Sequence, residues 1–441
     1  MAAPATAAPH PARMPARMPA RDVIAVVAGN GLEFYDFIAY AFFALQISRS
    51  FFPASTPGTS LLLSLASFGA GFLMRPLGAA VIGRLADRAG RRPAMLVSFS
   101  LMGLGMVGLA LTPSYGSIGL AAPLLVIAWR LLQGFSVGGE VGASLAYLVE
   151  AAPAERRGLY SSLQPMTADA AAFLSGLAGL ALSSALTPEQ LDEFGWRIAF
   201  LLGAAIVPVG LALRRALPET LAEPQAEAPA GPATDYRRVA VLGFGMLASG
   251  TVIGYVQDYL TTYAADTLGM SPRLAFAATM VSAFSMMCCD PLGGWLSDRV
   301  GRRPVMIAST ALLAGCTYPA FLAIVHFHSP AALYGACVLL GVLTGLNQGP
   351  VVAALAESLP RRVRGRTLSL VYALAIAVFG GSTQFAVKWL LRATGNALAP
   401  GWYMLGAALL GVVSMSLLRE SAPARRTPAG PAQIAPGARW R

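Results

Sequence analysis

Nine charged residues lie inside stretches of the chain that are otherwise apolar, and these residues are the best placed to do chemistry. On insertion scales, one charge near the centre of a membrane helix costs about 2.5–3.5 kcal/mol. The nine charges must therefore pair, take up protons or face a water-filled cavity. An acid in such a place can carry a proton, and an arginine can bind a carboxylate. The nine residues are Glu33, Asp36, Glu140, Asp169, Asp258, Asp290, Arg75, Arg130 and Lys388.

Helical spacing groups the acids nearest the N-terminus on one side of a helix. Asn30, Glu33 and Phe37 share a face because they stand at positions i, i+3 and i+7, and Asp36 follows Glu33 by three residues. Two neighbouring carboxyl groups in apolar surroundings are suited to binding and releasing a proton. We therefore predict Glu33 and Asp36 as proton-coupling residues, with Asp169 as a third.

A second polar stripe contains Arg130 and Gln133. The planar fork of an arginine matches a carboxylate, so we predict that Arg130 binds one, with Arg75 as a second candidate. Amide and hydroxyl groups on other spans can orient the oxygen atoms of the same ligand. The predicted substrate-binding residues are Asn30, Arg75, Arg130, Gln133, Tyr160, Gln164, Asn347 and Gln348. The alternative is a permanent set of structural ion pairs among Glu33, Asp36, Arg75 and Arg130.

The segments that must position these side chains are strongly apolar. Of the 441 residues, 56% are hydrophobic and 12% are charged, whereas soluble proteins carry about 25% charged residues. A transmembrane helix needs about 20 apolar residues, so the chain is predicted to be an all-α membrane protein with twelve transmembrane helices. The twelve apolar stretches are 23–48, 58–83, 94–112, 118–147, 158–186, 197–215, 238–264, 273–295, 304–325, 331–356, 366–391 and 400–418.

The basic residues predict the orientation of the chain in the bilayer. A net charge of +11 suggests nucleic-acid binding in a soluble protein, but in a membrane protein it marks the cytoplasmic loops. If the N-terminus is cytoplasmic, 25 of the 32 Lys and Arg residues fall in cytoplasmic segments and 4 fall on the opposite side. We therefore expect a multi-pass protein of the bacterial inner membrane with both termini in the cytoplasm. Lys388 either attracts anions at the outer mouth or anchors its helix at the interface.

The chain repeats itself at about half its length. Residues 83–93 recur at 294–304, and five residues of 148–158 recur in 355–365. We predict two pseudo-symmetric six-helix bundles with a binding site between them, near the bilayer midplane. The expected division is an N-terminal tail at 1–22, bundles at 23–217 and 239–418, a cytoplasmic linker at 218–238, and a C-terminal tail at 419–441.

The repeated loop predicts a latch at the cytoplasmic end. Gly83 and Gly90 permit tight turns and close helix approach, and Asp87 can pair with neighbouring arginines or cap a helix. The alternative is that the loop only anchors the chain through its positive charge. The predicted gate residues are Gly83, Asp87, Arg88, Gly90, Arg91, Glu140, Asp290, Asp298, Arg299, Gly301 and Arg302.

The repeated Gly-x-Leu-x-Asp-x-x-Gly-Arg-Arg loop resembles the signature of the major facilitator superfamily. Residues 29–37, 72–78, 130–140 and 158–164 resemble the metabolite–proton symporters within it, whose members carry citrate, tricarballylate, 2-oxoglutarate, shikimate, and proline or betaine. From about residue 22 to 418, the chain is most similar to the citrate–proton symporters. The resemblance implies the major facilitator fold and proton-coupled uptake of a citrate-like tri- or dicarboxylate by alternating access.

The fifth and seventh spans depart from the citrate carriers. Those carriers often read Trp-Gln-Ser-Ala-Ser-Gln-Gln in span 5, where this chain keeps Gln164 and adds Asp169. Gln257 and Asp258 also stand in span 7 at positions that are usually uncharged there. The departures keep open a less charged substrate, either a zwitterionic osmolyte such as proline or betaine, or a monocarboxylate such as shikimate.

Other functional classes find little support in the residues. The four cysteines lack metal-ligand spacing, and no nucleophile–base motif points to an enzyme. We expect no cofactor, no metal and no nucleic-acid partner. The partners implied are a small organic acid, protons and the lipid bilayer, and a monomer suffices because two halves can form a complete path.

Overall fold

The computed structural model describes residues 30–31, 34–54, 56–89, 91–138, 148, 152–215, 236–359 and 361–422. Every regular element in these ranges is helical. The helices group into twelve membrane-crossing segments, as the apolar stretches predict. Eight helices among the described residues are long and apolar enough to cross a membrane, and residues 96–111 and 121–137 form two shorter apolar helices.

The N-terminal half begins with helical residues 34–42. It continues through α2 (Ala44–Phe51), α3 (Pro57–Leu73), α4 (Arg75–Ala89), α5 (Arg91–Leu111), α6 (Tyr115–Ile118), α7 (Ala121–Val137), η1 (Ala154–Arg156), α9 (Arg157–Ala185), α10 (Pro188–Gln190), η2 (Leu191–Gly195) and α11 (Trp196–Arg215).

The C-terminal half begins at Tyr236, which lies inside the linker predicted at 218–238. It contains α12 (Tyr236–Asp258), α13 (Leu260–Thr262), η3 (Tyr263–Thr267), α14 (Pro272–Val300), α15 (Arg302–Phe327), α16 (Pro330–Ser358), α17 (Arg361–Ala375), η4 (Ile376–Gly380), α18 (Gly381–Thr394) and α19 (Ala399–Leu417).

Local sequence explains where several long helices begin. A Ser or Thr followed by Pro precedes α3, α14 and α16, and Pro fits the first helical turn because its missing N–H has no partner there. The hydroxyl groups of Thr56 and Ser329 each accept a hydrogen bond from a backbone N–H of the first turn. Gly395, in the left-handed conformation, ends α18.

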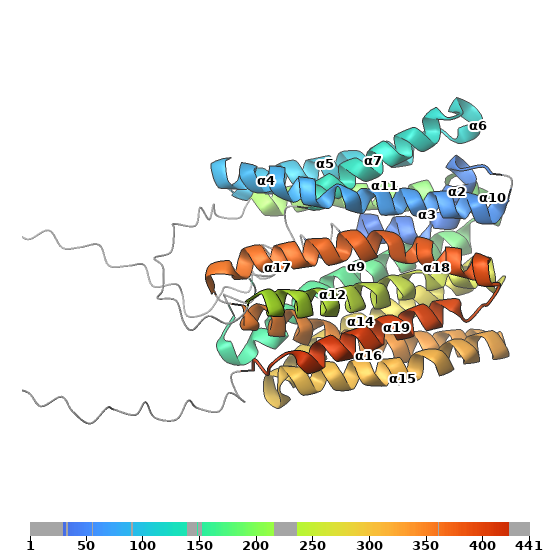
Figure 1. Cartoon of the computed structure of the whole chain (residues 1–441). Coiled ribbons are helices and arrows are strands. Elements are labelled where there is room, and N and C mark those ends of the chain that lie inside the picture. Colours follow the sequence, from blue (N-terminus) through green and yellow to red (C-terminus); the bar gives the residue numbers. More distant parts are fainter. Residues whose placement is uncertain are drawn as a thin grey trace, which may run out of the picture.

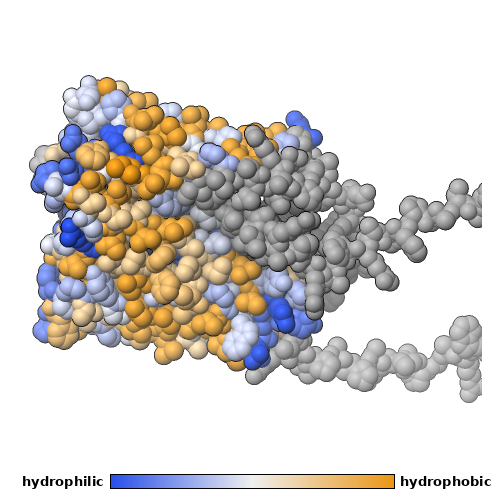
Figure 2. All heavy atoms as spheres, turned by 180° about the vertical axis from the view of Figure 1, so that it is seen from behind, coloured by the Kyte–Doolittle hydropathy of each residue, from blue (hydrophilic) through white to orange (hydrophobic). Residues whose placement is uncertain are grey.

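The helices run side by side as one bundle (Figure 1). Hydrophobic side chains cover the middle of the face seen in Figure 2, and hydrophilic side chains gather toward its ends. This is the pattern of a protein surrounded by lipid. We call the end that carries Asp298, Arg302 and Glu420 the arginine end, and the opposite end, with Arg49 and Asp192, the Asp192 end.

The two halves meet through two sets of helices. In the first, α9 packs extensively against α14 and also against α16, and in the second α3 packs against α18. Glycines permit the closest contacts, because a Cβ atom on Gly158 would lie 2.5 Å from the Gly294 carbonyl oxygen, and one on Gly69 would lie 2.5 Å from that of Gly381. The surfaces between the halves therefore position any site that both halves share.

Candidate functional site

A cavity of about 150 Å³ lies between the two halves. Helices α9, α12, α16 and α17 all contribute to its walls. Its polar lining residues are Gln164, Asp169, Thr251, Tyr255, Asp258, Asn347, Gln348 and Tyr372, and none of its described lining residues is basic. This is the position between bundles in which the repeat predicted a binding site.

Three acids gather beside this cavity, and we call Asp169, Asp258 and Asp290 the interface acids. The carboxyl groups of Asp169 on α9 and Asp290 on α14 lie within hydrogen-bonding distance of each other, across the two halves. Asp258 on α12 lies close enough for its charge to act on Asp169. Asp169 and Asp290 are both buried. Carboxyl groups from two separate halves therefore share one apolar site.

Few groups neutralise the interface acids. The Gln348 amide Nε2 donates to Asp169 Oδ2 over 3.3 Å, again from the opposite half. Neither carboxyl oxygen of Asp290 accepts a hydrogen bond from a donor group in the described ranges. When two carboxyl oxygens face each other without a donor, a stable contact requires a proton between them.

Arg75 lies outside the cavity, next to two tyrosines, Tyr255 and Tyr372, that line it. The Arg75 guanidinium packs against the rings of Phe37 and Phe72, 4.5 and 4.2 Å from their centroids. Its charge acts on the hydroxyl groups of Tyr255 and Tyr372, which line the cavity. Arg75 does not itself line the cavity, and its charge reaches the cavity through the two tyrosines.

The predicted polar residues differ in whether their side chains are already hydrogen-bonded and whether they line the cavity. Asn30 Nδ2 donates to the Gln164 carbonyl oxygen and to Thr167 Oγ1, over 3.0 and 2.9 Å, so it joins two helices of one half. Asn347 lines the cavity, and its buried Oδ1 has no hydrogen-bond partner in the described ranges. Tyr160 lies in the first turn of α9 and is not among the cavity-lining residues.

Asp36, Arg130 and Gln133 form a closed set that we call the buried triad. Arg130 Nη1 donates to Asp36 Oδ2 over 3.3 Å and to Gln133 Oε1 over 2.7 Å. Gln133 Nε2 completes the ring by donating to Asp36 Oδ1 over 3.0 Å. All three side chains are 0% exposed. The positive charge of Arg130 is thus already matched by a carboxylate from the same half.

Aromatic rings surround the Arg130 guanidinium. Its central carbon lies 4.3 Å from the Phe37 ring centroid, 4.6 Å from that of Tyr40 and 5.4 Å from that of Phe68. No member of the buried triad lines the central cavity. The structure therefore places Arg130 and Gln133 away from the cavity in which the sequence interpretation had them bind substrate, and it pairs Arg130 with Asp36 as the alternative interpretation described.

Charged side chains and the first backbone N–H groups of α9 form a network that joins the halves at the arginine end. Both oxygen atoms of Asp298 accept backbone N–H groups at the start of α9, from Gly158 and Leu159, each over 2.9 Å. Arg302 Nη1 bonds Asp298 over 2.6 Å, and its Nε and Nη2 reach both oxygen atoms of Glu357 over 3.2 and 3.1 Å. Asp298 thus stabilises the positive end of a helix in the opposite half.

Glu420, after the last helix, caps the start of α15. Its carboxylate accepts the backbone N–H groups of Arg302 and Arg303, each over 3.0 Å, and those of Ser421 and Ala422. Burial acts to raise the pKa of the Glu420 carboxyl, but these four donors outweigh it and hold the pKa below its usual value. Ser421 extends the network, since its hydroxyl donates to Glu357 over 2.9 Å.

Other predicted gate residues take different positions. Arg299 stacks on the Trp295 ring at 4.1 Å, and Gly301 has a φ of 115°, which favours glycine. Asp290 lies with the interface acids and not in the Arg302 network. Arg88 is exposed on α4.

The prediction for Gly83 differs from what the structure shows. It stands inside α4, and no atom of the described residues lies within 4 Å of the place where a Cβ would lie, so within these residues it makes neither a tight turn nor a close approach. Its counterpart in the repeat, Gly294, does make the close approach, to Gly158, because α14 packs closely against α9. Glu33, Gly90, Glu140 and the side chains of Asp87 and Arg91 lie outside the described residues.

Sequence reasoning missed Asp258, Tyr255 and Tyr372 as cavity residues. The sequence identified Asp258 only as a charged residue within span 7, and in the structure the helical segment continues beyond it through α13 and η3 to Thr267. The available signal was the spacing of Tyr255 and Asp258, which are three residues apart and so share a helix face. Among the described residues, no group of three or more His, Cys, Asp or Glu side chains could hold a metal ion.

The major facilitator superfamily model matches residues 28–378 and 242–440. The chain belongs to the major facilitator superfamily. It is 39% identical to the citrate–proton symporter of Klebsiella pneumoniae over 416 residues, which span 92% of this chain and 93% of the relative. It is 37% identical to the alpha-ketoglutarate permease of Escherichia coli K12 over 406 residues, which span 90% of this chain and 93% of that protein.

Solved structures of the superfamily share the fold. A partially occluded, inward-open structure of the xylose transporter of E. coli superposes with a TM-score of 0.75 at 17% identity, over 91% of this chain and 98% of that one. The family and the two-bundle fold predicted from the sequence are thus confirmed. The relatives are transporters, so the prediction of a multi-pass membrane transporter and not an enzyme is also confirmed.

Proposed function

We propose that this chain takes up a small organic acid, a citrate-like tri- or dicarboxylate, together with protons by alternating access. The observation that carries the proposal is the contact of Asp169 and Asp290 across the two halves, beside the central cavity. Relatives at 39% and 37% identity are named for citrate and for alpha-ketoglutarate, which are both carboxylates.

The interface acids couple proton binding to anion binding. Ionised carboxylates repel a carboxylate substrate strongly in a site of low dielectric constant. Protons on the interface acids remove that repulsion and turn the acids into hydrogen-bond donors. Substrate therefore enters a cavity that has already taken up protons. Tyr255, Tyr372 and the amide groups of Asn347 and Gln348 orient its oxygen atoms, and Arg75 adds positive charge from behind the tyrosines.

Movement of the halves releases the proton. Asp169 belongs to one half, whereas Asp290, Asp258 and Gln348 belong to the other. When the halves separate on one side, water reaches the carboxyl groups and the pair no longer holds its proton in common. Repulsion between ionised acids and the bound anion then favours release of the substrate.

The arginine end faces the cytoplasm in this proposal. Arg and Lys residues concentrate in the segments at this end, as in cytoplasmic loops of inner-membrane proteins, and both termini are cytoplasmic. The Asp298–Arg302–Glu357 network holds the halves together there and must open before substrate leaves. A single copy of the chain contains both halves of the path, so a monomer is sufficient for transport.

A zwitterionic substrate is the second candidate, because unpaired carboxylates beside a cavity also suit a positively charged ammonium group. The proline/betaine transporter of Salmonella typhimurium is 28% identical to this chain over 418 residues. This substrate would bind to ionised interface acids, whereas the organic acid binds to protonated ones.

Uptake by the purified protein in liposomes tests the proposal. Labelled citrate, tricarballylate, 2-oxoglutarate, shikimate and proline are offered at an acid external pH with a neutral interior. We expect accumulation of a tri- or dicarboxylate that disappears when a protonophore collapses the gradient. Accumulation of proline alone would support the second candidate, and carboxylate uptake that is indifferent to the gradient would contradict proton coupling.

A further inference from the structure

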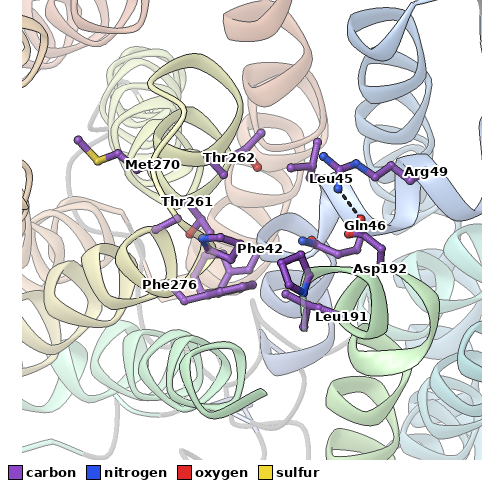
Figure 3. A pocket seen from close by; sticks show the side chains of 14 residues that line it. Phe42, Leu45, Gln46, Arg49, Leu191, Asp192, Thr261, Thr262, Met270 and Phe276 are labelled. Carbon is purple, nitrogen blue, oxygen red and sulfur yellow. Dashed lines mark hydrogen bonds and ion pairs between the residues drawn. The ribbon is translucent and has the colours of Figure 1, made fainter. Parts of the chain in front are cut away.

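A second cavity, of about 230 Å³, opens at the Asp192 end between the two halves (Figure 3). Helix α2, α10 and η2 contribute one wall, and α13, η3 and α14 contribute the other. Its volume is comparable to the 150 Å³ of the central cavity. Its lining residues are Phe42, Leu45, Gln46, Arg49, Pro188, Leu191, Asp192, Thr261, Thr262, Ala265, Met270, Pro272, Ala275 and Phe276.

Two buried polar side chains line this cavity without a partner. Gln46 is 5% exposed and Thr262 is 2% exposed. In the described part of the chain, the buried Thr262 hydroxyl has no hydrogen-bond partner. The Gln46 amide also bonds no other described residue. Buried polar groups nearly always have a partner, so the Thr262 hydroxyl and the Gln46 amide on the facing wall are free to bond a molecule with polar atoms. Gln46 comes from one half and Thr262 from the other.

Arg49 gives the cavity an anion-binding group. Its Nη1 pairs with the Asp192 carboxylate, as Figure 3 shows, and the side chain is 55% exposed. A guanidinium has five N–H donors, so Arg49 can keep the Asp192 contact and still donate to a carboxylate that arrives from solution. Apolar residues such as Leu45 and Met270 cover the remaining surface and favour a small organic molecule over a hydrated inorganic ion.

The two cavities are separate along α14. Phe276 lines the cavity at the Asp192 end, and Met286 lines the central one, about 15 Å further along the helix at 1.5 Å per residue. Phe276 also contacts Phe43 of the opposite half, with 4.9 Å between ring centroids. This aromatic pair must part when the halves open at the Asp192 end.

We propose that the cavity at the Asp192 end is a capture site, which binds the carboxylate substrate before it enters the central cavity. Arg49 binds a carboxylate oxygen, while the Gln46 amide and the Thr262 hydroxyl bind other oxygen atoms of the same molecule. The proposal rests on the proposed function for the class of substrate. It adds a site that solute arriving from the Asp192 end meets before the central cavity.

Directional transport kinetics of two variants test this capture site. Gln46→Leu and Thr262→Val remove the unpartnered groups and leave the central cavity unchanged. We expect each to raise the KM of uptake from the Asp192 end about tenfold or more, the effect of one lost hydrogen bond to a charged group, with kcat unchanged. The KM of transport in the opposite direction stays at its wild-type value, while its kcat falls by the same factor, because the gradients and not the protein fix the ratio of kcat/KM in the two directions. A general packing defect would change the KM in both directions.

Thr394→Val is the matched control, because it makes the same chemical change on an exposed residue of α18 outside the cavity. Ala265→Phe fills the cavity and should raise the same KM. Unchanged uptake KM in all three cavity variants, with active wild type, would overturn the capture site but leave the proposed function intact. Wild type that transports no carboxylate would instead overturn the proposed function.

Discussion

The buried triad and the interface acids both hold carboxyl groups in apolar surroundings, but they differ in charge balance and in location. Asp36 in the triad is paired with Arg130 and held by Gln133, all within the N-terminal half. Among the interface acids, Asp169 and Asp290 face each other from different halves, and no described lining residue of the adjacent cavity is basic.

The difference indicates which acids can follow the transport cycle. The Asp36 carboxylate already has an arginine and an amide as partners, so it needs no proton for a stable contact, and all three residues lie within one half. Two carboxyl groups that face each other across the halves require a proton while they are in contact, and they can release it when the halves separate. We therefore propose a structural role for the triad and a proton-coupling role for the interface acids.

The largest expected effect comes from breaking the triad. Asp36→Asn leaves the Arg130 charge buried without a carboxylate, and we expect the free energy of unfolding to fall by about 3–5 kcal/mol. The double variant Asp36→Asn/Arg130→Met removes both charges and should recover most of this loss. Thermal unfolding in detergent measures both variants. If Asp36→Asn is as stable as wild type, the Asp36–Arg130 pair does not stabilise the fold.

The next effect concerns coupling. Asp290→Asn keeps the shape of the interface acids but removes the shared proton, so proton-driven accumulation should fall about tenfold or more, while exchange of substrate for substrate continues. The stabilised double variant of the triad is the control, and it should retain accumulation. If the double variant loses coupling and Asp290→Asn keeps it, the two clusters have been assigned the wrong tasks.

A smaller effect is expected at the hydrogen bond between Gln348 and Asp169. Gln348→Leu removes a cross-half contact of 3.3 Å and a cavity-lining amide, so the KM of uptake should rise about threefold to tenfold. Gln257→Leu is the matched control. Gln257 bonds to Thr344 and Ser282 within its own half and does not line the cavity, so its loss should affect stability without changing KM.

The smallest effect belongs to Glu420, outside both clusters. Glu420→Gln weakens the cap on α15, and we expect a loss of about 1 kcal/mol at neutral pH. Because the folded-state pKa of Glu420 is lowered, its stabilising contribution is present above the unfolded-state pKa of about 4.3 and disappears as the pH falls through the folded-state value. The unfolding curves of variant and wild type should therefore differ at neutral pH and converge at acid pH. A difference in stability between variant and wild type that persists at acid pH would contradict the proposal that ionised Glu420 caps α15.

The sequence predicted the twelve spans, the repeat and the Asp298–Arg302 loop, because apolar length and repeated motifs are local features. It also identified Asp169 and Asp290 as intramembrane acids but assigned Asp290 to the gate. Spacing along one helix predicts a shared face, as for Tyr255 and Asp258, but not which face of another helix lies opposite. The meeting of Asp169 with Asp290 depends on how α9 packs on α14.

Infrared spectroscopy of the purified, substrate-free protein tests the central claim most directly, because a protonated carboxyl group has a carbonyl band distinct from that of a carboxylate. The account predicts such a band in wild type and in Asp36→Asn/Arg130→Met. The band should be lost or shifted in Asp169→Asn and in Asp290→Asn. A band that is unchanged in both interface variants but absent from the triad variant would contradict the account.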